Sequence, residues 1–207
     1  MDFLSGISTL IFPQKCLLCA VYNENISAET GRCRKCSEIL QFNVRSTKRG
    51  GIEIFAGTNY SPQMARLILA AKESNHKFAR RYLAQSILAS LKLAMLSHTQ
   101  HPNYEKRIIV IPIPSRNGAN RLRGYAHILK LIDEIFILNT EHKLLQINCL
   151  AHKKRIKDQS SLNFHEREQN MKEAFGVKSE GLEQIAHTNS KGEAAPLIFL
   201  VDDLVTS

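Results

Sequence analysis

The stretch LIFLVDDLVTS, residues 197–207, sets the expectation for the fold. Five apolar residues run directly into Asp202 and Asp203, and the hydroxyl pair Thr206-Ser207 follows. A continuous apolar run of this length is typical of a strand buried on both faces of a parallel sheet. Ligands of open α/β sheets bind beyond the carboxyl ends of such strands. There, paired carboxylates can accept hydrogen bonds from sugar hydroxyls or help to hold a Mg²⁺ that a diphosphate carries, although a solvated Asp-Asp turn would look the same.

The bulk composition is that of a globular protein with room for one sizeable core and a small module. The chain has 207 residues, of which 43% are apolar, and 28 basic residues outnumber 19 acidic ones, for a formal charge of +9. This balance favours phosphate-rich partners, either nucleotides or nucleic acid. No apolar run approaches the roughly 18 residues of a membrane span, and the N-terminus lacks the pattern of a secretory signal. We therefore expect a cytoplasmic protein whose thiols stay reduced.

Four cysteines form two C-x₂-C pairs, Cys16/Cys19 and Cys33/Cys36, with 13 residues between the pairs. This spacing predicts four thiolates arranged tetrahedrally around one Zn²⁺, whereas two disulfides or a redox role are weaker explanations in a reducing compartment. A site closed by four cysteines has no open coordination position, so its zinc should be structural.

The segment that follows is strongly basic. Six lysines and arginines lie between Arg32 and Arg49, and only Glu38 opposes them. Such a cluster is either a solvated surface or a contact for nucleic acid or protein. The pair Gly50-Gly51 then breaks the chain. We accordingly predict a zinc-ribbon-like module over residues 1–50 and an α/β domain over 51–207.

Apolar periodicity predicts the remaining elements. Ser61-Pro62 should open a helix, with Ser61 as N-cap and Met64, Leu67, Ile68 and Ala71 on its buried face. The other expected segments are helices over 2–11, about 77–96 and up to 136; strands over 52–57, 107–113, 143–149 and 173–177; a loop over 115–118; a polar stretch over 152–170; and a polar connector over 178–195.

Taken together, these segments resemble the ComF family, phosphoribosyltransferase-like proteins tied to DNA uptake in competent bacteria. The end of the chain, Val201 to Ser207, is similar to the phosphoribosyl-pyrophosphate (PRPP) motif of type I phosphoribosyltransferases. The resemblance covers nearly the whole chain and is carried by the four cysteines together with Tyr60, Arg66, Leu67, Ile68, Lys72, Ile111-Pro112-Ile113-Pro114, Arg121, Arg123, Gly124, Tyr125, Arg155, Gln159, Leu162, Arg167, Asn170, Ala174 and Phe175.

The resemblance implies a type I phosphoribosyltransferase-like parallel sheet flanked by helices and a PRPP-binding site. Asp202 and Asp203 would hold the ribose hydroxyls, and Mg²⁺ would bridge the diphosphate oxygens. The remaining site residues implied by the resemblance are Ser115 and Arg116 for the pyrophosphate, Arg123 and Lys72 for leaving-group charge, and Thr206 and Ser207 for the 5′-phosphate. The acceptor substrate and the oligomeric state stay open.

Two departures from the family pattern affect this site. Ala126-His127 stands where the pattern has Asn-Gln after the Arg-Gly-aromatic motif. The pattern also continues beyond Ser207 with Gly-x-Thr, a helix and a last strand, and this helix would aim backbone N–H groups at the 5′-phosphate. A chain without those parts is expected to bind PRPP weakly or to need a partner.

Three functions therefore remain in view. The first is a PRPP-dependent transferase with an unknown acceptor. The second is a non-catalytic protein of the same fold that binds PRPP or a nucleotide, or contacts proteins of DNA uptake. The third is a zinc-ribbon protein that binds nucleic acid such as single-stranded DNA through the basic cluster.

Overall fold

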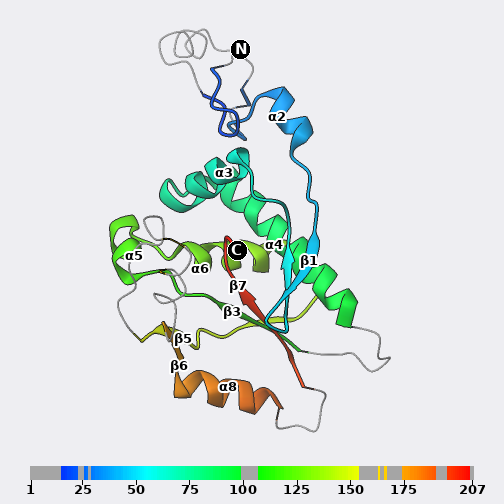
Figure 1. The fold of residues 1–207 in the computed structure, drawn as a ribbon, viewed down its shortest axis with the longest axis vertical. Coiled ribbons are helices and arrows are strands. Elements are labelled where there is room, and N and C mark those ends of the chain that lie inside the picture. Colours follow the sequence, from blue (N-terminus) through cyan, green and yellow to red (C-terminus); the bar gives the residue numbers. More distant parts are fainter. Residues whose placement is uncertain are drawn as a thin grey trace. The chain divides into compact units, whose positions relative to one another are not determined.

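The computed structural model divides the chain into two compact units, Met1–Ser97 and His98–Ser207 (Figure 1). The structure describes residues 15–22, 26–27, 29–98, 107–153, 163, 166, 174–189 and 195–205. The helix predicted over 2–11, most of the polar stretch 152–170, and Thr206 and Ser207 lie outside the described residues.

In its described residues the first unit contains a β-hairpin and three helices. These elements are α2 (Arg34–Ile39), β1 (Arg45–Arg49), β2 (Ile52–Ala56), α3 (Pro62–Glu73) and α4 (Lys77–His98). β1 and β2 pair antiparallel around Gly50 and Gly51, whose φ angles of 53° and 81° are those of a tight hairpin turn that glycine adopts without strain. The sequence predicted β2 but not β1, and the boundary proposed at residue 50 lies in this turn.

The start of α3 follows its sequence signals. The Ser61 hydroxyl accepts a hydrogen bond from the Met64 amide at 3.1 Å, and Pro62 occupies the first helical position. The predicted buried face is confirmed: Met64, Leu67, Ile68 and Ala71 are all buried. The sequence therefore determines both the start and the orientation of this helix.

The predicted second helix is confirmed as α4, which is 22 residues long and ends at His98. Leu83, Leu91 and Met95 are buried as expected, while Ile87 is half-buried. Gly57 at the end of β2 meets α4 so closely that a Cβ there would lie 2.8 Å from the Ser86 carbonyl carbon. In the described part of the chain, no helix combines the length and the apolarity needed to cross a bilayer.

The second unit is built on a three-stranded parallel sheet with the order β4-β3-β7 (Figure 1). Its elements are β3 (Ile108–Pro112), α5 (Asn117–Arg123), α6 (His127–Leu138), β4 (Leu144–Gln146), β5 (Leu150–His152), β6 (Phe175–Val177), α8 (Ser179–Asn189) and β7 (Leu197–Val201). β5 and β6 form a separate antiparallel pair. Helices α6 and α8 flank the parallel sheet, so the mixed α/β class with a helix-flanked parallel sheet is confirmed.

The central strand, β3, is buried on both faces, but the prediction that the last strand, β7, is buried on both faces is wrong. All five residues of β3 are buried, whereas Ile198 and Leu200 of β7 are 46% and 60% exposed. Ile198 and Leu200 lie beside Ile109 and Ile111 of β3 in the register, on the face that Ile185 of α8 contacts. Ile185 of α8 packs against the cluster that contains Ile109 and Ile111, while the Ile198 and Leu200 side chains of the neighbouring strand stay partly exposed.

The connector predicted over 178–195 is also wrong, because α8 occupies Ser179–Asn189. Gly181 and the surrounding polar residues were interpreted as loop signals. In the structure Gly181 instead allows α8 to approach Cys149, and Ile185 packs against the core of Ile109 and its neighbours. Arg107 donates a hydrogen bond to the Thr188 carbonyl at 2.6 Å, satisfying one of the carbonyls at the end of α8.

The loop predicted over 115–118 is shorter than expected, because α5 begins at Asn117. α5 ends at Gly124, whose φ of 75° is the left-handed conformation common after helices. The helix predicted up to residue 136 is α6, with a buried face of His127, Ile128, Leu131, Ile132 and Ile135.

Candidate functional site

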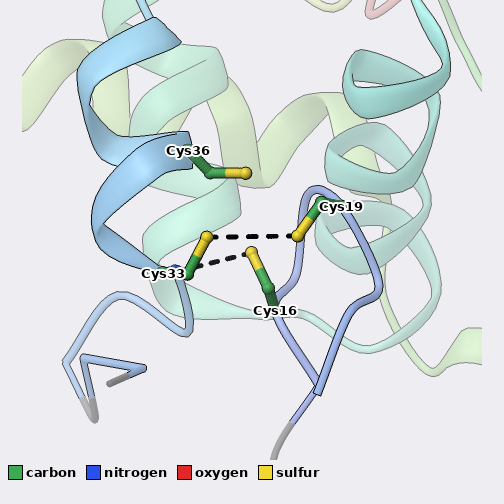
Figure 2. Close-up of side chains that lie close together, drawn as sticks. All are labelled: Cys16, Cys19, Cys33 and Cys36. Carbon is green, nitrogen blue, oxygen red and sulfur yellow. Dashed lines mark hydrogen bonds between the residues drawn. The ribbon is translucent and has the colours of Figure 1, made fainter. Parts of the chain in front are cut away.

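The four predicted zinc ligands converge in the first unit. The sulfurs of Cys16, Cys19, Cys33 and Cys36 all lie within 4.8 Å of one another, and all four residues are free thiols (Figure 2). Figure 2 shows the side chains pointing toward a common centre. A tetrahedral site with Zn–S bonds of about 2.3 Å needs sulfurs about 3.8 Å apart. The Cys19 and Cys33 sulfurs are 4.0 Å apart, so the cluster is compatible with structural zinc.

Backbone turns bring the sulfurs together. In the first pair, the Ala20 amide donates to the Cys16 carbonyl at 2.9 Å, and Ala20 takes a φ of 60° to close the turn. In the second pair, Cys33 is the N-cap of α2 and Cys36 lies in its first turn. The Cys33 amide donates to the Cys16 sulfur at 3.4 Å and thereby links the two turns.

The electrostatics of the cluster favour a bound cation. Burial opposes ionisation of Cys16, but the amides of Cys19, Cys33 and Leu18 point at its sulfur, and the pKa falls to about 6. Burial and the neighbouring sulfurs of Cys33, Cys19 and Cys16 raise the pKa of Cys36 to about 12. Ionisation of the Cys16 thiol is thus favoured, whereas ionisation of the Cys36 thiol is opposed. A divalent cation reverses that opposition, because it stabilises every thiolate that coordinates it.

The cysteine turns are anchored to the helices of the same unit. Arg66 of α3 donates to the Leu18 carbonyl at 2.6 Å, and Leu18 itself is only 1% exposed. The Arg32 guanidinium lies 4.1 Å from the centre of the Phe78 ring of α4. Both turns therefore contact the α3–α4 pair, and Arg66, which the family pattern singled out, has a structural role here.

A second candidate site lies at the carboxyl edge of the parallel sheet. Pro112 of β3 pairs with Val201 of β7, and the Ile113 amide donates to the Val201 carbonyl at 3.0 Å. The segments that leave these strands therefore begin side by side. One carries Ser115 and Arg116, and the other carries Asp202 and Asp203; we call these four residues the carboxyl-edge site.

His127 joins this site from the start of α6. Its Nε2 lies 3.4 Å from Oδ2 of Asp203, and both side chains are buried. The Asp203 amide in turn donates to the Asp202 carboxylate at 2.8 Å. The sequence flagged His127 only as a departure from the family pattern. A stronger signal was its place four residues before Leu131, on the buried stripe of α6.

The other predicted site residues lie in helices α5 and α3 or outside the described residues. Arg123 lies in the last turn of α5, where its Nε donates to the Ala119 carbonyl at 3.0 Å. Lys72 lies in the last turn of α3, in the first unit, and its role in binding stays a prediction. Thr206 and Ser207, like most of the motif between Arg155 and Asn170, fall outside the described residues.

No protein-family model matches this chain, and no curated protein matches it either. The resemblance to the ComF family therefore rests on the motifs alone and stays a prediction.

Proposed function

We propose that this protein is a ComF-like member of the type I phosphoribosyltransferases that binds PRPP at the carboxyl-edge site. The observation that carries the proposal is the adjacency of the segments after β3 and β7, which bear Ser115-Arg116 and Asp202-Asp203. Hydroxyl and guanidinium groups suit a diphosphate, and a carboxylate suits vicinal sugar hydroxyls. The region beyond the carboxyl ends of parallel strands is where ligands of open α/β sheets bind.

In the proposed reaction, an acceptor nucleophile forms a bond to C1 of the ribose while the bond from C1 to the pyrophosphate oxygen breaks. The electron pair leaves with the pyrophosphate, whose charge Arg116 and the Mg²⁺ that accompanies PRPP offset. Asp202 orients the sugar, because positioning and charge neutralisation dominate a transition state of this kind. The same contacts without an acceptor would make a PRPP-binding protein that does not turn over.

Calorimetric titration of the zinc-loaded protein with PRPP and Mg²⁺ tests the proposal. We expect saturable binding that Asp202→Asn weakens about ten- to a hundred-fold, because a hydrogen bond to a charged acceptor contributes about 1.5–3 kcal/mol. Asp133→Asn is the matched control, since this carboxylate lies on the surface of α6, 3.7 Å from Lys130. A folded wild-type protein that gives no saturable heat would overturn the proposal.

A nucleic-acid interface is the second candidate, and the exposure of β1 favours it. All five β1 residues are exposed, and three of them, Arg45, Lys48 and Arg49, are basic. If β1 contacts phosphates, binding of a labelled single-stranded oligonucleotide should weaken steeply with salt, by about 0.7 in log–log slope per neutralised phosphate. Changing all three residues to Gln should then flatten the slope by about two, whereas Lys130→Gln should not. A salt-independent affinity would exclude this role.

A further inference from the structure

The two adjacent aspartates lie in different surroundings. Both residues are half-buried, but the Asp203 side chain is only 8% exposed and faces His127, whose side chain is 1% exposed. We infer that Asp203 is a positioning residue held by His127, and that Asp202 is the carboxylate that meets the ligand. The assignment of Asp202 to the ligand rests on the proposed function, whereas the pairing of Asp203 with His127 does not.

The surroundings of His127 indicate that Asp203 is the partner of its imidazole ring. Among the described residues neither ring nitrogen has a hydrogen-bond partner, and the Asp203 carboxylate is the charged group within ion-pair distance of the ring. A buried imidazole without any partner is costly, because its nitrogens have lost their hydrogen bonds to water. The Asp203 carboxylate is the group placed to offset this cost, since its Oδ2 lies 3.4 Å from Nε2 and can accept a hydrogen bond from an Nε2–H.

The start of α6 gives a second reason for a carboxylate at this place. Its N-cap is Ala126, which offers no side-chain hydrogen bond, and its first turn contains no acidic residue. A negative charge beside the first turn of a helix is stabilised by the exposed amides and the helix dipole. Asp203, which faces His127 at the start of α6, supplies that charge from the segment after β7, since the first turn of α6 has no acidic residue of its own.

A continuous chain of contacts then leads from His127 to the ligand-facing aspartate. The imidazole faces the Asp203 carboxylate, and the Asp203 backbone amide donates to Oδ1 of Asp202 at 2.8 Å. Fixing the Asp203 side chain fixes its backbone, and the amide of that backbone orients the Asp202 carboxylate. His127 therefore acts on ligand binding through Asp203 rather than by contact.

The test measures two quantities on the same variants of the zinc-loaded chain: the urea midpoint of unfolding and the affinity for PRPP with Mg²⁺. Asp202→Asn should weaken PRPP binding at least about tenfold and should lower the midpoint less than Asp203→Asn does. Asp203→Asn and His127→Leu should each lower the midpoint. Their effects in the double variant should be smaller than the sum, because each change removes the same contact.

The conservative variant His127→Gln separates positioning from simple packing. Gln keeps an N–H donor of similar reach, so PRPP affinity should recover to within about threefold of wild type, while His127→Leu should lose about tenfold. If Asp203→Asn fails to fold, the His127 variants still decide whether His127 acts by positioning Asp203 or only by packing.

Three results would overturn the inference. The first is equal loss of PRPP affinity in Asp202→Asn and Asp203→Asn with an unchanged midpoint, since both residues would then be ligand contacts. The second is strictly additive effects on unfolding, and the third is a His127→Gln variant no better than His127→Leu. A folded wild-type chain without PRPP affinity would refute the proposed function instead, and the unfolding measurements would still decide whether His127 and Asp203 form a pair.

Discussion

Removing the metal from the zinc-loaded protein should unfold the two cysteine turns and lower the thermal stability of the first unit. Between residues 15 and 40 the described buried side chains are only Cys16, Leu18, Cys33 and Cys36. Such a segment has no apolar core that could replace the metal. Structural zinc contributes about 10–16 kcal/mol of apparent binding free energy in small zinc peptides, so its loss should outweigh any single hydrogen bond, including that from Arg66 to Leu18.

Circular dichroism melting before and after chelation, together with metal analysis and thiol titration, measures this effect. We expect one zinc per chain, a lower melting temperature after chelation, and four thiols that become reactive as the metal leaves. Cys33→Ser should abolish zinc binding. Cys149→Ser is the matched control: this fifth thiol is buried in the core of the second unit, so the zinc content should not change. An unchanged melting curve after complete zinc removal would refute the structural role.

The features that could be predicted from the sequence are those with a local physical cause. The C-x₂-C spacing of Cys16/Cys19 and Cys33/Cys36 predicts a cluster because each short turn carries two sulfurs to one side of the chain. Ser61-Pro62 predicts the start of α3 because the hydroxyl satisfies an amide and proline needs none. The strand predicted over 107–113 is confirmed as the buried β3, because its run of isoleucine and valine side chains prefers to be removed from water.

The features that sequence reasoning missed depend on contacts between distant segments. Whether Ile198 and Leu200 are buried depends on which other segments pack over that face of the sheet, and no local pattern records this. The role inferred for His127 depends on its contact with Asp203, which is 76 residues away in the chain. Gly181 is a loop signal by propensity, but in the structure it is a packing residue.

Replacing Gly181 with alanine should destabilise the second unit, against the preference of helices for alanine. By propensity alone the change would stabilise α8 by about 1 kcal/mol. However, a Cβ at position 181 would come within 3.0 Å of both Cβ and Cα of Cys149. The Cys149 Cα belongs to the backbone and cannot move without shifting the chain. Overpacking should therefore destabilise the second unit by about 1–3 kcal/mol or more, which outweighs the gain from helix propensity. The urea midpoint should therefore fall.

Gly118→Ala is the control for Gly181→Ala, because Gly118 lies in α5 with nothing within 4 Å of its added Cβ. This variant should gain about 0.5–1 kcal/mol from helix propensity alone. If Gly181→Ala were equally stabilising, α8 would not pack on Cys149 as described. Ile185 of α8 packs against the cluster that contains Ile109 and Ile111 of β3, the strand that leads to Ser115, so a displaced α8 should also disturb the edge where Asp202 lies. The packing of Gly181 in α8 would then affect the proposed carboxyl-edge site.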